Sequence, residues 1–139
     1  MRIGVISGVS AGEDGTLDGV VRQAKALEAR GFATLWLPNI FGLDAITTLA
    51  IAGRETSKIE LGTAVVPTYP RHPVAIAQQA LTAGAAANGR FTLGLGLSHK
   101  IVIEDLMGLS YAKPLRHMRE YLSVLQELLA GRPAKFEGQ

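Results

Sequence analysis

The sequence predicts an α/β protein built on a parallel sheet, and three observations support this class. Apolar segments of strand length alternate with segments of helical periodicity along the 139 residues, which is the pattern of consecutive β/α units. Most of the strand segments are apolar on both faces, as parallel strands buried between two layers are. The links from strand to helix are longer and more polar than the links from helix to strand, as at the ligand-binding end of α/β folds.

Four strands are expected, each followed by a helix. The predicted strands are RIGVIS (2–7), ATLWLP (33–38), IELGTAVV (59–66) and FTLGLGL (91–97). The predicted helices begin near Thr16, Asp44, His72–Pro73 and Pro114 and end near Gly31, Ser57, Ala87 and Gly131. These boundaries follow from the usual start and stop residues of helices. A glycine-rich loop, SGVSAGEDG, follows the first strand, a longer loop precedes the last helix, and seven apolar residues from Leu115 to Leu129 form a stripe on that helix.

Composition excludes several functional classes. Hydrophobic residues make up 47% of the chain, the net charge is only +2, and no run of Lys or Arg occurs, so we expect no nucleic-acid or membrane partner. There is no cysteine, which removes disulfides and thiolate ligands, and no acidic partner lies at metal-binding spacing from a histidine. We therefore expect no metal site. MRIGVISG is interpreted as a first strand rather than a signal peptide, so we expect a cytoplasmic location.

The run RFTLGLGLSHKI (90–101) tests whether the glycines cradle a phosphate. Gly94 and Gly96 match the first two glycines of a dinucleotide fingerprint, but His99 occupies the third position and no helix start follows, so the fingerprint is rejected. The two glycines instead share one face of a strand. Glycine there indicates close approach of a backbone or of a ligand, and the sequence leaves open whether the face is a tight interior or the floor of a site.

The carboxyl ends of the predicted strands define a candidate site. They offer Ser7 and Gly8, then Asn39, then residues 63–68, then Ser98 and His99. These residues are polar but nearly uncharged, and they include neither a carboxylate pair nor a nucleophile elbow. Amide, hydroxyl and imidazole groups beside an apolar wall suit a flat cofactor that performs the chemistry itself.

Single side chains at these ends have alternative structural roles. Asn39 forms a turn or hydrogen-bonds a ligand, and His99 either caps a strand end or contacts a ligand and transfers a proton. His72 is expected to cap a helix and His117 to be solvated on the charged face of the last helix. Trp36 is expected to pack in the core or against a helix rather than to line a site.

Three longer segments carry a resemblance to a known family. LGTAVVPTYPRHPVAIAQQALT, NGRFTLGLGLSH and GLSYAKPLRHMREYLSVLQELLAG resemble the luciferase-like family of flavin and deazaflavin oxidoreductases, and above all its coenzyme F420-dependent branch. The resemblance implies a TIM-type (β/α)8 barrel, of which residues 1–139 would form a single N-terminal half with about four β/α units. It implies hydride transfer between coenzyme F420 and a small organic substrate; the alternative is an FMN-dependent monooxygenase.

The resemblance also assigns roles to residues at the strand ends. It implies a bulge after the third strand with a non-proline cis peptide, which here would join Ala64 and Val65. The implied cofactor-binding residues are Asn39, Thr63, Ala64, Val65, Ser98 and His99, with His99 as the catalytic residue. Relatives often carry an acidic residue or His where Asn39 stands, and some carry Glu where Ser98 and His99 stand, so the proton donor departs from the family pattern.

The length of the chain gives a last expectation. A full barrel takes about 250 residues, and in relatives the second half binds the phosphate tail of the cofactor, so activity is expected to need that half. A half-barrel exposes two sheet edges and an apolar inner face. We therefore expect a homo-oligomer or pairing with a second half-barrel, and a non-catalytic, self-associating half-barrel is the alternative from another class.

Overall fold

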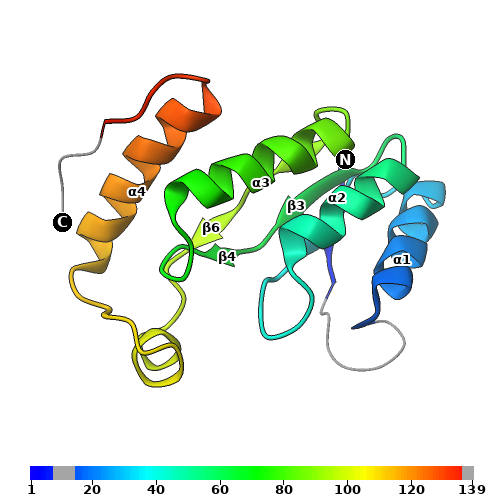
Figure 1. Ribbon diagram of the computed structural model, residues 1–139. Helices are drawn as coiled ribbons and strands as arrows, with labels where there is room; N and C mark the ends of the chain where they lie inside the picture. Colours follow the sequence, from blue (N-terminus) through cyan, green and yellow to red (C-terminus); the bar gives the residue numbers. More distant parts are fainter. Residues whose placement is uncertain (8–14, 136–139) are drawn as a thin grey trace. The chain divides into compact units, whose positions relative to one another are not determined.

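The computed structural model describes residues 1–7 and 15–135 (Figure 1). The strands are β1 (Gly4–Ile6), β2 (Thr34–Leu37), β3 (Glu60–Thr63), β4 (Val66–Pro67), β5 (Phe91–Thr92) and β6 (Leu95–Gly96). The helices are α1 (Leu17–Ala29), α2 (Ala45–Glu55), α3 (Pro73–Ala86), the π-helix η2 (Val102–Leu106) and α4 (Pro114–Leu129). The predicted loop SGVSAGEDG lies largely outside the described residues, and so does the end of the chain from residue 136.

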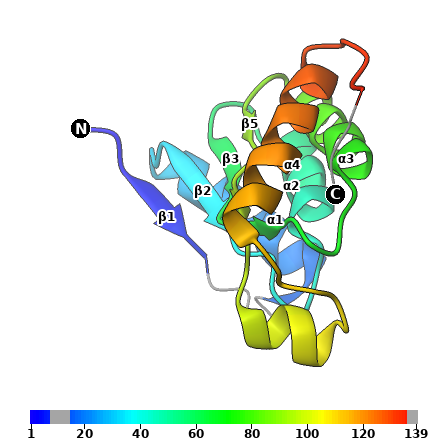
Figure 2. The ribbon, with the colours of Figure 1, turned by 90° about the vertical axis from the view of Figure 1, so that its left-hand side faces the viewer.

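The chain forms two compact units, Met1–Val66 with Gln79–Leu95, and Pro67–Gln78 with Gly96–Gln139. The first contains a parallel sheet in the order β1-β2-β3-β5, whose strands lie side by side in Figure 2. All three strand pairs are parallel, with Trp36 opposite Ile6 on one side and opposite Gly62 on the other. The predicted parallel α/β architecture is therefore confirmed.

The core of the first unit lies between this sheet and the helices α1 and α2. Leu35 and Leu37 of β2 and Leu61 of β3 are buried against apolar residues of the two helices. Because neighbouring residues of a strand point to opposite faces, Trp36 points away from that core. A Cβ on Gly62 would lie 2.3 Å from the indole ring, so Trp36 covers Gly62 on the other face of the sheet. The expectation that Trp36 packs in the core or against a helix is wrong.

The helices begin and end at the residues that the sequence indicates. Thr16 accepts a hydrogen bond from the amide of Gly19, and Asp44 accepts one from the amide of Thr47. His72 Nδ1 accepts the amide hydrogen of Val74 at 3.2 Å, which confirms its predicted capping role. Gly31 adopts a φ of 79° after α1, a conformation that suits glycine at a helix C-terminus.

Two predicted strands are interrupted in the structure. The third divides into β3 and β4, and the fourth into β5 and β6, with β4 paired to β6. The amide of Val66 donates to the carbonyl of Gly94, and the amide of Thr68 donates to that of Gly96. The third and fourth predicted strands therefore pair with each other on both sides of the interruption, and these backbone groups stay hydrogen-bonded.

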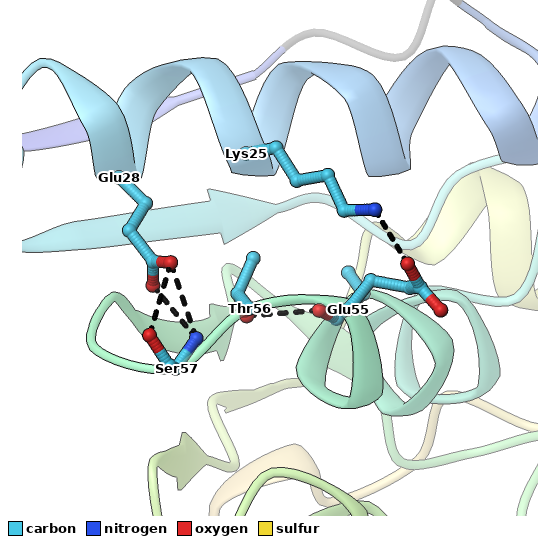
Figure 3. Close-up of polar contacts among 6 residues, drawn as sticks. Lys25, Glu28, Glu55, Thr56 and Ser57 are labelled. Atoms are coloured by element: carbon cyan, nitrogen blue, oxygen red, sulfur yellow. Dashed lines mark hydrogen bonds and ion pairs between the residues drawn. The ribbon is translucent and has the colours of Figure 1, made fainter.

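Two charged side chains tie together the amino-terminal ends of β3 and β5. Glu28 of α1 accepts hydrogen bonds from the amides of Ser57, Lys58 and Ile59, and Figure 3 shows its carboxylate reaching Ser57. Arg90, just before β5, donates to the carbonyls of Gly53, Thr56 and Ile59 and to the Thr56 hydroxyl. The link between α2 and β3 is thus held from both sides.

The second unit contains η2 and α4. The π-helix lies where the sequence predicts only a long loop, and it is anchored by Ile103, which is fully buried. On α4 only Tyr121 and Leu125 of the predicted apolar stripe are buried, whereas Leu115 is 79% exposed. The predicted apolar stripe is therefore buried only in part. Among the described residues, no helix is both long and apolar enough to cross a bilayer.

Candidate functional site

In the first unit, the loops after β2 and β3 are joined by backbone hydrogen bonds. The amide of Asn39 donates to the carbonyl of Val65 at 3.3 Å, and the amide of Ala64 donates to the carbonyl of Leu37 at 2.8 Å. The Asn39 side-chain oxygen accepts the amide hydrogen of Ala45 at 2.9 Å. Asn39 therefore has the turn-forming role that the sequence left open, because it connects its own loop to the start of α2.

The bond between Ala64 and Val65 is a cis peptide, as the family resemblance implies. Ala64 is partly buried, and Val65 leaves 43% of its surface exposed. The segment consequently presents an uncharged, apolar surface directly after β3. Four of the predicted site residues thus lie at the carboxyl ends of β2 and β3: Thr63 is the last residue of β3, and Asn39, Ala64 and Val65 lie in the two loops that follow these strands.

Thr63 connects this segment to the backbone beside Gly94. Its hydroxyl accepts from the amide of Gly94 at 2.8 Å and donates to the carbonyl of Gly94 at 2.9 Å. A Cβ on Gly94 would lie 1.9 Å from the carbonyl oxygen of Thr63. The first glycine of the run is therefore explained by close approach of backbone, and the Thr63 hydroxyl is occupied with holding that approach.

Ser98 and His99 lie in the second unit, at the end of the fourth strand. Ser98 has a φ of 62°, and its carbonyl accepts a hydrogen bond from the Tyr111 hydroxyl at 3.3 Å. His99 is exposed, and its carbonyl accepts the amide hydrogens of Val102 and Ile103. The backbone of His99 therefore starts the helical turn that leads into η2, and its imidazole stays accessible to solvent.

An aromatic cluster that the sequence did not indicate lies beside these residues. The rings of Tyr69 and His117 stack at 4.1 Å between centroids with 6° between planes, and Tyr69 also stacks on Tyr111 at 5.1 Å. His117 Nε2 is 3.0 Å from Thr68 Oγ1. Burial lowers the pKa of His117 below its ordinary value, although Glu120 acts in the opposite direction. The expectation that His117 is simply solvated is wrong.

A neutral hydrogen bond lies beside the cluster, at Tyr121. The Tyr121 hydroxyl donates to the carbonyl of Arg71 at 2.9 Å, and burial raises the pKa of Tyr121 to about 12. Burial also raises the pKa of Tyr69, with a further contribution from Tyr111 and Glu104. Both phenols therefore stay protonated at neutral pH. The hint in the sequence is that all three tyrosines and all three histidines lie within the quoted family segments, in a chain with few aromatic residues.

Ser7, at the carboxyl end of the predicted first strand, is engaged with α1. It is buried, and its hydroxyl donates to the side-chain oxygen of Gln23 in α1 at 2.6 Å. Gly8 lies outside the described residues. Within residues 1–7 and 15–135, no three His, Asp or Glu side chains are grouped in a way that could hold a metal ion.

Comparison with known proteins gives these features a family context. The family model for luciferase-like monooxygenases matches residues 1–139. The chain belongs to the luciferase-like monooxygenase family. It is 39% identical over 105 residues to a Mycobacterium tuberculosis protein assigned as a coenzyme F420-dependent oxidoreductase, covering 76% of this chain and 30% of that relative.

Solved structures of the luciferase-like family agree with the fold. A coenzyme F420-dependent tetrahydromethanopterin reductase from Methanopyrus kandleri superimposes with a TM-score of 0.80 at 26% identity, covering 99% of this chain and 42% of that one. The oxygenating constituent of 3,6-diketocamphane monooxygenase from Pseudomonas putida, solved with FMN, gives a TM-score of 0.83 at 20% identity and covers 100% and 42%. The predicted barrel-type fold, present here in part, is confirmed. The chain spans about a third of the length of the curated relatives it matches.

Proposed function

We propose that this chain is part of an oxidoreductase that transfers a hydride between a deazaflavin, coenzyme F420, and a small organic substrate. The observation that carries the proposal is the Ala64–Val65 segment, where the exposed Val65 side chain presents an uncharged surface after β3 in a chain related to a protein assigned as F420-dependent. When bound, the deazaflavin supplies a ring that can accept or release a hydride. A flat ring of this kind fits an apolar support with few fixed charges.

The residues proposed to contact the cofactor are those at the strand ends. Val65 would pack its exposed side chain against the ring, and Asn39 and Ala64 would border it. Thr63 would act by fixing the backbone that leads to Ala64, because its hydroxyl is bonded to Gly94. Ser98 would supply a polar contact from the end of the fourth strand.

His99 is the proposed catalytic residue. Hydride transfer to an organic substrate leaves a centre that needs a proton, and an imidazole can donate one near neutral pH. The imidazole of His99 is exposed, whereas His72 and His117 are each engaged in a hydrogen bond. His99 is thus the histidine best suited to exchange a proton with a bound substrate.

Parallel titrations of the chain with coenzyme F420 and with FMN test the proposal, with fluorescence as the readout. Tighter binding of F420, weakened by Val65→Asp, is the expected result. Tighter binding of FMN would instead support an FMN-dependent monooxygenase, in line with the fold shared with the FMN-bound P. putida protein. Binding of neither would contradict both and leave the non-catalytic half-barrel.

We also propose that the chain associates with a second copy or with a second half-barrel. The support comes from apolar side chains that the structure leaves exposed: Ile6 on the edge strand β1, and Leu115, Leu122 and Leu129 at seven-residue spacing on α4. Edge strands and apolar helix stripes of this kind favour association. Light scattering at micromolar concentration is expected to show a dimer or larger species, and a monodisperse monomer would contradict the pairing.

A further inference from the structure

The end of the fourth strand is enclosed by a closed series of contacts within the second unit. The series begins at the carbonyl of Gly96, passes through Thr68, His117, Tyr69 and Tyr111, and returns to the carbonyl of Ser98. We propose that Thr68, Tyr111 and His117 are positioning residues that hold Ser98 and His99 in the conformation a bound cofactor and substrate require. This inference rests on the function proposed above, in which Ser98 and His99 contact the bound molecules.

The first contact in the series is made by Thr68. Its side chain is fully buried, its amide donates to the carbonyl of Gly96 at 3.0 Å, and its hydroxyl lies 3.0 Å from His117 Nε2. A buried hydroxyl needs its partner, because an unpaired polar group in the interior costs free energy. The orientation of Thr68 therefore depends on His117. The hydrogen bond from the Thr68 amide to the Gly96 carbonyl depends on the same contact.

The second contact is aromatic. Tyr69 packs against both His117 and Tyr111, and such stacked pairs contribute beyond the area they bury. Tyr111 is fixed from another side as well, because its amide donates to Oε1 of Glu104 in η2 at 3.2 Å. The position of the Tyr111 hydroxyl is thus set by α4 and η2 together.

The third contact closes the series at Ser98. A φ of 62° is unfavourable for a residue other than glycine, so it persists only where neighbouring contacts hold it. The hydrogen bond from the Tyr111 hydroxyl to the Ser98 carbonyl is such a contact. The backbone turn at Ser98 sets the direction in which His99 leaves the strand, so the series acts on the proposed catalytic residue without touching the reacting atoms.

The test uses three variants, a rescue and a matched control. Thr68→Val removes the hydroxyl and keeps the shape of the side chain, His117→Phe keeps an aromatic ring for stacking but removes the imidazole nitrogens, and Tyr111→Phe removes only the phenol hydroxyl. Thr68→Ser restores a hydroxyl. Tyr121→Phe is the matched control, since it removes a phenol–carbonyl hydrogen bond of the same unit, to Arg71, that lies outside the series.

The first readout is the NMR chemical shift of the Ser98 and His99 amide signals in the ligand-free chain. We expect Thr68→Val, His117→Phe and Tyr111→Phe to shift both signals, Thr68→Ser to return them to their original positions, and Tyr121→Phe to leave them in place. The double variant of Thr68 and His117 should shift the signals no further than the larger single one. Unmoved Ser98 and His99 signals in a folded Tyr111→Phe protein would overturn the inference, as would equal shifts in Tyr121→Phe.

The second readout is the dissociation constant for coenzyme F420. Loss of one neutral hydrogen bond should weaken binding about threefold to tenfold in the three variants, with Thr68→Ser near the original affinity. Unchanged affinity in all three would overturn the positioning role. If the unmodified chain binds neither F420 nor FMN, the proposed function fails, and the amide signals alone still decide whether the series holds Ser98 and His99.

Discussion

The amino-terminal ends of the sheet strands and the second unit are held in different ways. Between α2 and β3 the backbone is fixed by two ionised side chains, the carboxylate of Glu28 and the guanidinium of Arg90. In the second unit, the backbone around Ser98 is held by neutral hydroxyl and imidazole groups and by stacked rings. Parallel α/β folds generally use the amino ends of strands for stability and the carboxyl ends for ligands.

This difference separates the effects that substitutions should have. Hydrogen bonds from charged groups to backbone are stronger than neutral ones, so losing them costs more stability. Neutral contacts at the end of a strand cost less when lost, but they set the geometry of the exposed residues that follow. Substitutions at the amino ends should therefore change folding, and those around Ser98 should change binding.

Removal of the Arg90 side chain should have the largest effect. Arg90→Ala leaves the carbonyls of Gly53, Thr56 and Ile59 without their donor, and we expect the free energy of unfolding to fall by about 3 kcal/mol. Urea denaturation measures the change. Arg54→Ala, an exposed arginine on α2, is the control and should stay within about 0.5 kcal/mol. Equal losses in the two variants would contradict the role given to Arg90.

A methyl group at Gly94 should have the next largest effect. Gly94→Ala places a Cβ 1.9 Å from the carbonyl oxygen of Thr63, so backbone must move apart, and the free energy of unfolding should fall by about 2 kcal/mol. Gly84→Ala is the control, because a Cβ there meets nothing within 4 Å and the position is helical; it should raise stability by about 0.5 kcal/mol. A harmless Gly94→Ala would show that the strands are not closely packed at this point.

The smallest effect belongs to Glu28, and it depends on pH. Burial acts to raise the pKa of Glu28, but hydrogen bonds from the amides of Ile59, Lys58 and Ser57 outweigh it, so the pKa lies below the ordinary value of 4.5. A carboxyl group whose pKa is lower in the folded state stabilises the fold at pH values above its unfolded-state pKa. This stabilisation is lost as the pH falls through its folded-state pKa. Glu28→Gln should therefore cost about 1 kcal/mol near pH 7 and progressively less below about pH 4.5.

Thermal unfolding of both proteins across this pH range measures the difference. Glu55→Gln serves as the control: its carboxylate pairs with the exposed Lys25 (Figure 3), and exposed pairs often contribute nothing measurable. A Glu28→Gln difference that stays constant down to pH 3 would show that the carboxylate charge does not contribute.

Local signals in the sequence account for most of the fold. Thr16 and Asp44 predict helix starts because a side-chain oxygen there can accept an amide hydrogen of the first turn, and both do so. The parallel sheet follows from apolar segments separated by helices. The cis bond at Ala64–Val65 follows only from the family resemblance, since nothing in the local sequence requires it.

The parts that could not be predicted depend on contacts between distant residues. The fourth strand is interrupted because Thr63 approaches Gly94, and His117 is partly buried because it meets Thr68 and Tyr69 of another segment. The periodicity of α4 places His117 among charged residues and gives no sign of that partner. Likewise, alternation in β2 shows that Trp36 and Leu35 face opposite ways, but only the packing of Leu35 against α1 and α2 shows which face meets the helices.

An NMR titration of the ¹⁵N-labelled chain with coenzyme F420 separates the carboxyl ends of the strands from their amino ends. We expect the amide signals of Asn39, Ala64, Val65, Ser98 and His99 to shift with one common dissociation constant, while those of Ser57, Lys58 and Arg90 at the amino ends stay in place. Shifts confined to the amino ends, or no shifts at saturating F420 while FMN moves none of these signals either, would contradict this expectation.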